Sequence, residues 1–530
     1  MRKSRRLKLA RDNKSMSTNI SIGEFLTTRA HMNPHKEALF DVASDKRVTY
    51  QELDARSNRC ANALLSLGLA RGDRVALLAN NGHQFAESFF GVAKTGLVVM
   101  PLNWRLTASE LAFILKDGGA TVMIFDAEFL PVVEELREMG NAGSDVVHWI
   151  CIGSPAPEYA RDYETLLEAS KETEPSRKSR QDDNLFIMYT SGTTGNPKGV
   201  VHTHSTVFWA MLTLNATADS HFNDRYLLML PMFHVGALTP LISSTYNGTT
   251  LVMLKNFDPG KAWELIEQER ITTTLAVPAM LSFMLKVPGY EKTDWSSLRY
   301  VSSGAAPVPV SLINTYTEMG IHIYQIYGMT ETCGPACMIG SDDAVSKIGS
   351  TGKSFFHTEV RVIDEQGNNQ PPGEPGEVIV RGPHIMKEYW NRPDATADAI
   401  VDGWLQTGDV ATWDEEGFVT IRDRKKDMII SGGENVYPAE IENVLLQHPD
   451  VSDAAVIAQV SERWGESPLA VIVASSDSLS EQDVMTHCVG KLARYKMPRK
   501  VEFAEDIPRN PSGKILKRLL REQFDGPAPE

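Results

Sequence analysis

Short apolar runs alternate with segments of helical spacing through the first part of the chain, and this alternation limits the possible folds more than any other feature. Arg74–Leu78 and Val98–Pro101 have the pattern of buried strands, and Phe85–Lys94 between them has the spacing of a helix. Strands that alternate with helices form a parallel sheet with helices on its faces. The alternation returns at Tyr226–Leu230 and Thr249–Leu254. We therefore expect an α/β protein with two layered subdomains, since a chain of 530 residues is too long for one core.

The pattern changes near Ser346, where the apolar runs become short and turns rich in glycine and proline separate them. Glu359–Asp364, Gly376–Arg381 and Gly417–Arg422 alternate like antiparallel strands and predict a small β subdomain. The charge cluster Asp423–Asp427 follows as the predicted linker, and a small α+β unit lies beyond it. The predicted parts are a basic tail, an N-terminal domain and a C-terminal domain, at residues 1–16, 17–425 and 426–530.

The composition excludes several classes of function. Lys and Arg number 53 against 68 Asp and Glu, and the net charge of −15 argues against general nucleic-acid binding. The five cysteines are few and scattered, as in a protein with reduced thiols. Cys333 and Cys337 lack the paired Cys-x-x-Cys units of a structural zinc site, and His202 and His204 are interpreted as incidental neighbours. No apolar run approaches the length of about 18 residues that a spanning helix needs.

The N-terminal stretch is strongly basic, and Asp12 is its only acidic residue before Met16. Its basic residues are Arg2, Lys3, Arg5, Arg6, Lys8, Arg11 and Lys14. No apolar core follows them, so the stretch does not have the pattern of a secretory signal. It is either a disordered tail, with Met16 as an alternative start, or an electrostatic tether to anionic lipid. We expect a cytoplasmic protein, and the tether would add peripheral contact with the inner face of the membrane.

Tyr189–Val200 is the stretch with the most specific chemistry. It holds three glycines, four serine or threonine hydroxyls and Lys198 between two apolar runs. Backbone N–H groups of a glycine-rich turn can approach an anion closely, and a lysine adds positive charge. The Walker pattern is absent from the sequence. The stretch predicts a phosphate cradle, although a surface turn has the same composition.

Four further segments carry candidate chemical groups. His234 directly follows a buried apolar run, where a satisfied core histidine is the commoner interpretation of the residue taken alone. Glu331 has the group that magnesium prefers beside a polyphosphate, and Tyr327 just before it could stack on a base. Asp409 follows a glycine turn and could accept hydrogen bonds from ribose hydroxyls. Lys514 stands on a loop rich in proline and glycine.

Together and in this order, the segments resemble the adenylate-forming superfamily of acyl-CoA synthetases, adenylation domains and luciferases. The resemblance covers about residues 22–520, and the stretches Asp183–Tyr189 and Met428–Pro438 look most like bacterial long-chain fatty-acyl-CoA synthetases. It implies an N-terminal domain of two α/β subdomains and a β-barrel-like subdomain, closed by a small mobile C-terminal domain. It also implies two steps: a carboxylate attacks the α-phosphate of ATP, and coenzyme A then displaces AMP from the acyl-AMP.

The resemblance implies roles for individual residues. Those implied to bind ATP or AMP are Thr190, Ser191, Gly192, Thr193, Thr194, Gly195, Lys198, Tyr327, Gly328, Thr330, Asp409, Arg424 and Lys514. Those implied to line the acyl site are His234, Val235, Gly236, Gly304, Ala305, Gly328 and Met329. The implied catalytic residues are Lys514, Glu331, Thr190 and His234, with Glu331 as the Mg²⁺ ligand. Lys426 matches the family's hinge, whose motion would replace Lys514 with the Gly432-Gly433 loop that faces coenzyme A.

Gly236 bears on the choice of acid. Aryl-acid ligases of the family often carry an aromatic residue near this position, whereas glycine leaves room for an extended chain. We therefore predict activation of a medium- to long-chain fatty acid, with an aryl- or phenylpropenoyl-CoA ligase as the alternative. An amino-acid adenylation domain is disfavoured because no carrier domain follows Lys514 in the sequence. A non-catalytic nucleotide sensor is disfavoured because Lys514 and Glu331 are both present.

The expected partners are small molecules: fatty acid, ATP and coenzyme A, with Mg²⁺ as cofactor and no nucleic acid. The segment Pro508–Lys514 resembles sites at which related bacterial synthetases are acetylated. A protein acetyltransferase that acts on Lys514 is therefore a further expectation, because acetylation removes the charge. The sequence is compatible with a monomer or a homodimer.

Overall fold

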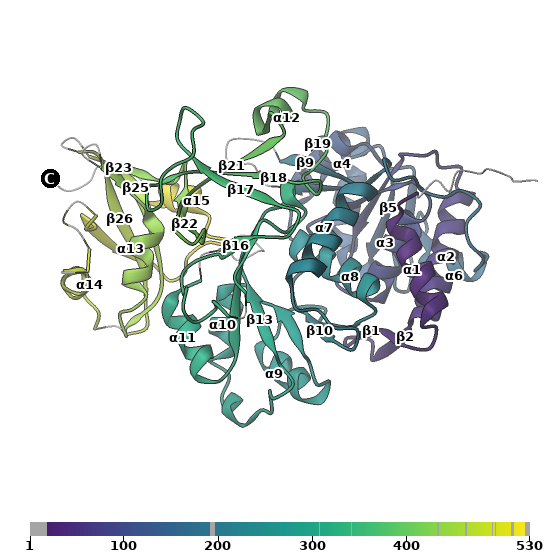
Figure 1. The fold of residues 1–530 in the computed structure, drawn as a ribbon. Coiled ribbons are helices and arrows are strands. Elements are labelled where there is room, and N and C mark those ends of the chain that lie inside the picture. The colour runs from purple at the N-terminus through teal and green to yellow at the C-terminus, as the bar shows by residue number, and fades with distance from the viewer. Residues whose placement is uncertain are drawn as a thin grey trace, which may run out of the picture.

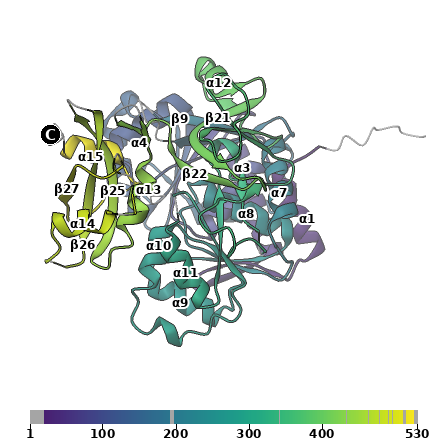
Figure 2. The ribbon, with the colours of Figure 1, turned by 60° about the vertical axis from the view of Figure 1, so that its left-hand side comes forward.

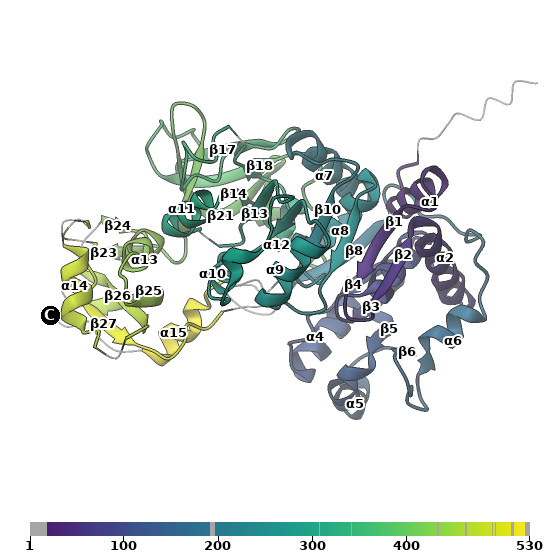
Figure 3. The ribbon, with the colours of Figure 1, turned by 90° about the horizontal axis from the view of Figure 1, so that it is seen from below.

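Four β-sheets organise the described part of the chain in its computed structural model (Figure 1). The structure describes residues 19–190, 197–306, 308–340, 342–431, 434–461, 464–476, 478–489, 491–492, 494, 496–509 and 514–524. The first two sheets are large and layered with helices, and the third is small and antiparallel. The fourth belongs to a C-terminal unit at the opposite end of the molecule from α1 and α2, as Figures 1 and 3 show.

The first sheet has the strand order β19-β9-β8-β4-β3-β5-β6-β7. Its strands are β3 (Arg74–Leu78), β4 (Val98–Pro101), β5 (Ala120–Asp126), β6 (His148–Ile152), β7 (Arg161–Asp162), β8 (Asn184–Thr190), β9 (Lys198–Thr203) and β19 (Glu388–Tyr389). The helices along this part of the chain are α2 (Tyr50–Ser66), α3 (His83–Ala93), α4 (Ala108–Gly118), α5 (Leu130–Glu138) and α6 (Tyr163–Glu168). β3 to β8 pair in parallel, as predicted. β9 is antiparallel to β8, because a short connection between two neighbouring strands reverses the chain. β19 is added at the edge, antiparallel to β9.

The second sheet has the order β16-β15-β14-β13-β12-β10-β11-β1-β2. Its strands are β1 (Glu37–Asp41), β2 (Lys46–Thr49), β10 (Arg225–Leu228), β11 (Thr250–Met253), β12 (Thr273–Leu275), β13 (Tyr300–Ser303), β14 (His322–Tyr327), β15 (Cys337–Met338) and β16 (Lys353–Ser354). Its helices are α1 (Ile22–Met32), α7 (His204–Thr217), α8 (Val235–Asn247), α9 (Pro259–Gln268), α10 (Pro278–Met284) and α11 (Val310–Glu318). Val75 and Phe186 of the first sheet share one apolar cluster with Leu227 and Val252 of the second. The two predicted α/β subdomains are therefore joined through a common core.

The third sheet contains only antiparallel pairs and follows the change of pattern seen in the sequence. Its strands are β17 (Glu359–Ile363), β18 (Gly376–Arg381), β20 (Ile400–Val401), β21 (Trp404–Trp413) and β22 (Val419–Arg424), with α12 (Pro393–Ala399) beside them. The charge cluster predicted as a linker begins inside this sheet, because Asp423 and Arg424 are the last residues of β22. Only residues 425–427 form the turn that leaves it. Arg424 is kept in the strand by its pairing with Asp409 of β21.

The C-terminal unit is a small α+β layer that Figure 2 shows as a separate body in yellow-green beside the rest of the chain. Its strands are β23 (Ile429–Ser431), β24 (Glu434–Val436), β25 (Val451–Ser461), β26 (Gly465–Ala474) and β27 (Lys500–Phe503). Its helices are α13 (Pro438–Leu445), α14 (Glu481–Cys488) and α15 (Lys517–Gln523). The predicted large N-terminal and small C-terminal parts are thus both present.

Two other observations bear on the sequence predictions. Each of the five cysteines is a buried free thiol. None of the helices in the described part of the chain is long and apolar enough to cross a membrane. The basic stretch 1–16 lies outside the described residues.

Candidate functional site

A cavity of about 610 Å³ lies where the two large sheets, the third sheet and the C-terminal unit meet. Loops that follow the carboxyl ends of parallel strands form much of its wall, as in other open α/β sheets. Thr190, Lys198, Glu331, Arg424 and Lys514 lie at one end. The other end extends between α8 and the strands of the second sheet. One continuous space therefore joins the predicted phosphate site to the predicted acyl site.

The predicted phosphate cradle is the connection between two paired strands. Thr190 ends β8 and lies opposite Lys198, which begins β9. Both residues line the cavity. Ser191, Gly192, Thr193, Thr194 and Gly195 lie outside the described residues. At the base of the connection, a Cβ on Gly199 would stand 2.7 Å from Ile187 Cγ2, so only glycine fits there.

Asp117, at the end of α4, bonds residues that flank this connection. Tyr189 Oη donates to Asp117 Oδ2 (2.7 Å), and Trp390 Nε1 donates to the Asp117 carbonyl (3.1 Å). Arg392 forms an ion pair with the same carboxylate. Trp390 N also donates to the Gly199 carbonyl (2.7 Å). The strand pair that carries Thr190 and Lys198 is thus fixed by side chains from segments far apart in the sequence.

Tyr327, Asp409 and Arg424 form one bonded group, although they come from three strands. Tyr327 Oη donates to Asp409 Oδ2 (2.6 Å), and Arg424 Nε lies 2.5 Å from Asp409 Oδ1. Burial, reinforced by the Asp409 carboxylate, raises the pKa of Tyr327 far above its usual value, so the phenol keeps its proton. Next to Tyr327, a Cβ on Gly328 would stand 1.5 Å from the Gly334 carbonyl oxygen, so glycine is required. The three residues predicted to contact the nucleoside are therefore brought together.

Glu331 is a buried carboxylate on the cavity wall, with 7% of its surface exposed. Tyr389 Oη donates to its Oε1 (2.7 Å), and Met386 N donates to its backbone carbonyl (2.8 Å). The neighbouring Thr330 carbonyl lies 2.8 Å from His202 Nε2. Burial lowers the pKa of His202 to about 4, so the ring is neutral and Nε2 must carry the proton that this carbonyl accepts. Glu331 and Thr330 are held by the first sheet although they follow β14 of the second.

Tyr389 lines the cavity and His202 bonds the carbonyl of Thr330, and the sequence prediction named neither of them for the site. His202 had been interpreted as incidental, and its bond to a backbone carbonyl has no signature in a sequence. Tyr389 lies on a strand of two residues whose neighbours form no periodic pattern. Neither residue could be found without the fold that brings the segments together.

Lys514 reaches the cavity from the C-terminal unit, close to Arg424. Burial, followed by the positive charge of Arg424, lowers the pKa of the Lys514 ammonium to about 8. The unit that carries it is fastened to the third sheet, since Asp423 Oδ2 accepts a hydrogen bond from Ala439 N (3.0 Å) at the start of α13. Lys426, the predicted hinge, is exposed on the turn between the two parts. Gly432 and Gly433 lie outside the described residues.

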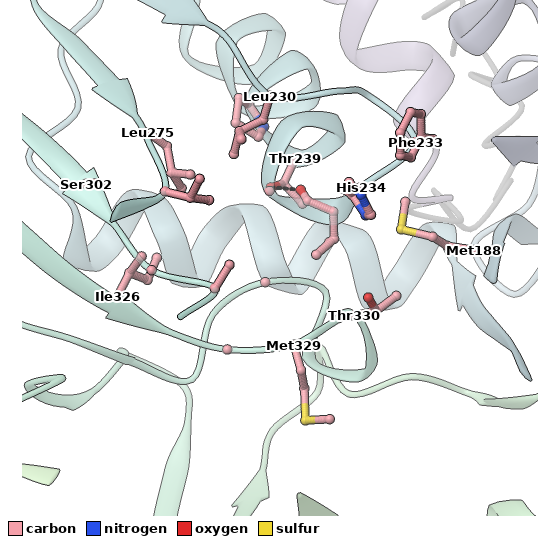
Figure 4. A pocket seen from close by; sticks show the side chains of 18 of the residues that line it. Met188, Leu230, Phe233, His234, Thr239, Leu275, Ser302, Ile326, Met329 and Thr330 are labelled. Atoms are coloured by element: carbon pink, nitrogen blue, oxygen red, sulfur yellow. Dashed lines mark hydrogen bonds between the residues drawn. The ribbon is translucent and has the colours of Figure 1, made fainter. Parts of the chain in front are cut away.

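Figure 4 shows Leu230, Leu275 and Ile326 around the acyl end of the cavity, whereas Ser243, Ser244 and Asn247 line it farther along α8. His234 stands at the junction with the phosphate end. Its buried Nε2 has no hydrogen-bond partner among the described residues. Burial, and then the charge of Arg105, lowers its pKa to about 4, so the imidazole is neutral.

Small residues keep this end open. Gly236 lines the cavity, and the nearest atom to a Cβ added there would be Leu230 Cδ1 at 3.6 Å. Gly304 is tighter, because an added Cβ would meet the Ile326 carbonyl oxygen at 2.2 Å. Ala305 also lines the cavity, in a left-handed conformation with φ of 67°. Each of these positions was predicted from the family resemblance, and each lies on the wall.

Met329 differs from the prediction in one respect. It belongs to the wall of the cavity, but its side chain points away from the other labelled residues in Figure 4. It packs against the apolar cluster of the third sheet. Its backbone, rather than its side chain, therefore bounds the acyl end.

The cavity continues along α8 from its first residue, Val235, to its last, Asn247. At 1.5 Å per residue these positions are about 18 Å apart along the helix. Leu214 and Ala218 at the end of α7 and Tyr300 of β13 also line this far part. The space is therefore elongated along α8.

Known proteins share this architecture over nearly the whole chain. The AMP-binding enzyme family matches residues 26–390, and the AMP-binding enzyme C-terminal domain matches residues 440–514. A long-chain-fatty-acid–CoA ligase of Mycobacterium tuberculosis is 47% identical over 510 residues, which cover 96% of this chain and 100% of that protein. A feruloyl-CoA synthase of Amycolatopsis is 39% identical, with 96% of this chain and 99% of that protein covered.

A solved structure described as a Mycobacterium tuberculosis fatty acyl CoA synthetase superposes with a TM-score of 0.77 at 46% identity. The match covers 95% of this chain and 98% of that one. Two family matches and full-length relatives agree with the family predicted from the motifs. The chain belongs to the AMP-binding enzyme family.

Proposed function

We propose that this protein is an AMP-forming acid–thiol ligase that converts a medium- to long-chain fatty acid to its acyl-CoA. The observation that carries the proposal is the continuity of one cavity. It extends along α8, includes the apolar side chains of Leu230, Leu275 and Ile326, and ends at Thr190, Lys198, Glu331 and Lys514. A fatty acid in the apolar part would present its carboxylate to the phosphate end. The similarity to a long-chain-fatty-acid–CoA ligase over the full length supports the same activity.

In the first step a carboxylate oxygen attacks the α-phosphorus of ATP, the bond to the bridging oxygen breaks, and pyrophosphate leaves. Negative charge develops on the phosphoryl oxygens, so the step needs fixed cations and donors rather than a protein nucleophile. Lys198, Arg424 and Lys514 bring three cationic side chains to this end of the cavity. Thr190 and the residues after it, with Thr330, would donate hydrogen bonds to the phosphates.

The nucleoside would lie against the group formed by Tyr327, Asp409 and Arg424. Tyr327 would flank the adenine, and the Asp409 oxygens, which can each accept more than one hydrogen bond, would take the ribose hydroxyls. Asp409 is already oriented by Tyr327 Oη and Arg424 Nε. Because these bonds already orient Asp409, the group would need little rearrangement to receive a nucleoside.

Magnesium suits the residues at the phosphate end. This ion usually takes one or two protein carboxylates and completes its shell with phosphate oxygens and water. Glu331 supplies such a carboxylate, and no cluster of three or more metal-ligating side chains occurs among the described residues. When bound, the ion would neutralise phosphate charge.

In the second step the thiol of coenzyme A attacks the acyl carbon, AMP leaves with the bonding electrons, and the thiol proton is released. His234, neutral and at the junction of the two ends, would line the path of the thiol. The C-terminal unit, residues 426–530, would rotate against residues 17–425 at Lys426. This motion would withdraw Lys514 and bring the Gly432-Gly433 loop to the pantetheine chain.

An aryl- or phenylpropenoyl-CoA ligase is the second candidate, because the feruloyl-CoA synthase is 39% identical over the full length. The length of the cavity along α8 and the glycine at position 236 favour an extended chain over a ring. Pyrophosphate release measured over straight-chain acids of two to twenty carbons and over cinnamate-like acids separates the two. Highest kcat/KM with a cinnamate-like acid would contradict the fatty-acid assignment, and no release with any acid would contradict the ligase activity.

Three further proposals concern the setting of the enzyme. We place it in the cytoplasm, with the basic stretch 1–16 able to contact anionic lipid. Acetylation of Lys514 would remove one of the cations of the first step and stop acyl-AMP formation. The activity of fully acetylated protein tests the effect of acetylation, and vesicle flotation with and without residues 1–16 tests the lipid contact. Light scattering distinguishes the monomer from the homodimer, both of which are compatible with the sequence.

A further inference from the structure

The short strand β19 links the two halves of the phosphate end. Tyr389 pairs with Val200 of β9, and Trp390 N donates to the Gly199 carbonyl (2.7 Å). Met386, three residues before Tyr389, donates its N–H to the carbonyl of Glu331 (2.8 Å). The segment from Met386 to Trp390 is therefore bonded at its first residue to Glu331 and at its last residues to β9, the strand that begins with Lys198.

Within this segment, the Tyr389 side chain faces the cavity and contacts both charged groups. Its Oη donates to Glu331 Oε1 (2.7 Å). The Lys198 ammonium lies 4.9 Å from the centre of its ring, within the range of a cation–π contact. One tyrosine thus touches both the lysine of the predicted phosphate cradle and the predicted Mg²⁺ ligand.

We infer that Tyr389 is a positioning residue for the metal and phosphate side of the reaction. The hydroxyl fixes the orientation of the Glu331 carboxylate, so that its other oxygen is directed to the cation. The ring supports the Lys198 ammonium where the phosphates lie. The inference rests on the proposed function, because it assumes that ATP and Mg²⁺ bind at this end.

The two contacts can be separated by two substitutions. Tyr389→Phe removes the hydroxyl and keeps the ring, whereas Tyr389→Leu removes both. Tyr316→Phe is the matched control, since Tyr316 Oη donates to the Leu281 carbonyl (2.8 Å) in the core and lies away from the cavity. ATP binding to the full-length protein is measured by calorimetry without acid substrate, first in EDTA and then over a series of free Mg²⁺ concentrations.

Tyr389→Phe is expected to raise the Mg²⁺ concentration for half-maximal ATP binding by about tenfold, as for other residues that orient a metal ligand. Its ATP affinity in EDTA should match that of the unchanged protein and of Tyr316→Phe. Tyr389→Leu should show the same Mg²⁺ shift and also bind ATP about threefold more weakly in EDTA. An unshifted Mg²⁺ dependence in Tyr389→Phe would overturn the role of the hydroxyl.

A double substitution tests whether the hydroxyl acts through the carboxylate. If it does, Tyr389→Phe combined with Glu331→Gln binds ATP at each Mg²⁺ concentration as Glu331→Gln does alone. An additional loss would show that Tyr389 acts by another route, such as general destabilisation, and thermal unfolding of each variant would detect the latter. Failure of the unchanged protein to bind ATP in the calorimetric titration would contradict the proposed function itself. If the unchanged protein binds ATP and the variants behave otherwise than expected, only the inference about Tyr389 fails.

Discussion

The two ends of the cavity are built on different physical principles. At the proposed nucleotide end, Glu331 lines the cavity and bonds Tyr389, and Arg424 lines it and pairs with Asp409, which also accepts from Tyr327. At the proposed acyl end, Gly236 and Gly304 contribute by leaving space beside the apolar side chains of Leu230 and Ile326. The hydrogen bonds at the nucleotide end require particular side chains, whereas many combinations of side chains can produce the shape of the acyl end. Substitutions should therefore abolish chemistry at one end and change only the choice of acid at the other.

The largest effect is expected for Lys514→Ala. Loss of a positioned cation should slow acyl-AMP formation by at least about 100-fold. The second step, started from supplied acyl-AMP and coenzyme A, should be nearly unchanged, because Lys514 is proposed to leave the site before it. Pyrophosphate release and acyl-CoA formation are measured separately. Lys261→Ala, which removes a lysine from a surface ion pair with Glu264, is the control.

Two outcomes would contradict this expectation. Full acyl-AMP formation by Lys514→Ala would remove the lysine from the mechanism. An equal loss in both steps would indicate that Lys514 serves the C-terminal unit as a whole, and the rotation about Lys426 would lose its support.

At the acyl end, Gly236→Phe should alter the substrate rather than the chemistry. A side chain there would enter the cavity and displace about three methylenes, each worth roughly 0.8 kcal/mol, so kcat/KM for long acids should fall by about 50-fold. Short acids should be activated as before, and the KM for ATP should not change. Gly236→Ala is the control, because its Cβ would stand at ordinary contact distance, 3.6 Å, from Leu230. A uniform loss with all acids would show that the cavity does not house the chain.

The same contrast explains how much the sequence could predict. Strands such as Arg74–Leu78 and Gly376–Arg381 have the predicted bounds, because apolar runs and alternation are local properties. Roles could be predicted for Asp409 and Lys514 because the family resemblance rests on short, glycine-marked segments that contain them. Tyr389 could not, since its importance comes from β19 pairing with a strand almost two hundred residues earlier, and no local pattern encodes such a pairing.

The linker shows the same limit at another scale. The charges of Asp423–Asp427 were predicted to be a linker, yet the first two of these residues complete β22. Their charges are used in ion pairs and caps with Asp409 and Ala439, which the sequence alone does not bring near. Long-range partners, rather than composition, decide whether a charged run is exposed or structural.

Asp409→Asn should have an intermediate effect. The asparagine amide has the shape of the carboxylate but lacks the negative charge that contacts Tyr327 and Arg424. Loss of one hydrogen bond to a charged group should raise the KM for ATP by about twentyfold. The order of preference among acids should stay the same, which separates this end of the cavity from the other. Initial rates over ATP concentration, with Asp294→Asn on the surface as control, measure the effect. A changed acid preference with an unchanged KM for ATP would contradict the division of the cavity into two ends.

The smallest effect is a pH dependence confined to the first step. The Lys514 ammonium has its pKa lowered to about 8 by burial and by Arg424, so the free enzyme carries the cation below this pH and loses it above. The kcat/KM for ATP in acyl-AMP formation should fall by about tenfold from pH 7 to pH 9, because this parameter follows the free enzyme. Lys514→Arg should lack this fall, since arginine stays charged throughout the range. The second step should not share the limb, because the lysine is then away from the reacting atoms. If kcat/KM for ATP still falls near pH 8 in Lys514→Arg, another group is responsible for the pH dependence, and the expectation for Lys514 is contradicted.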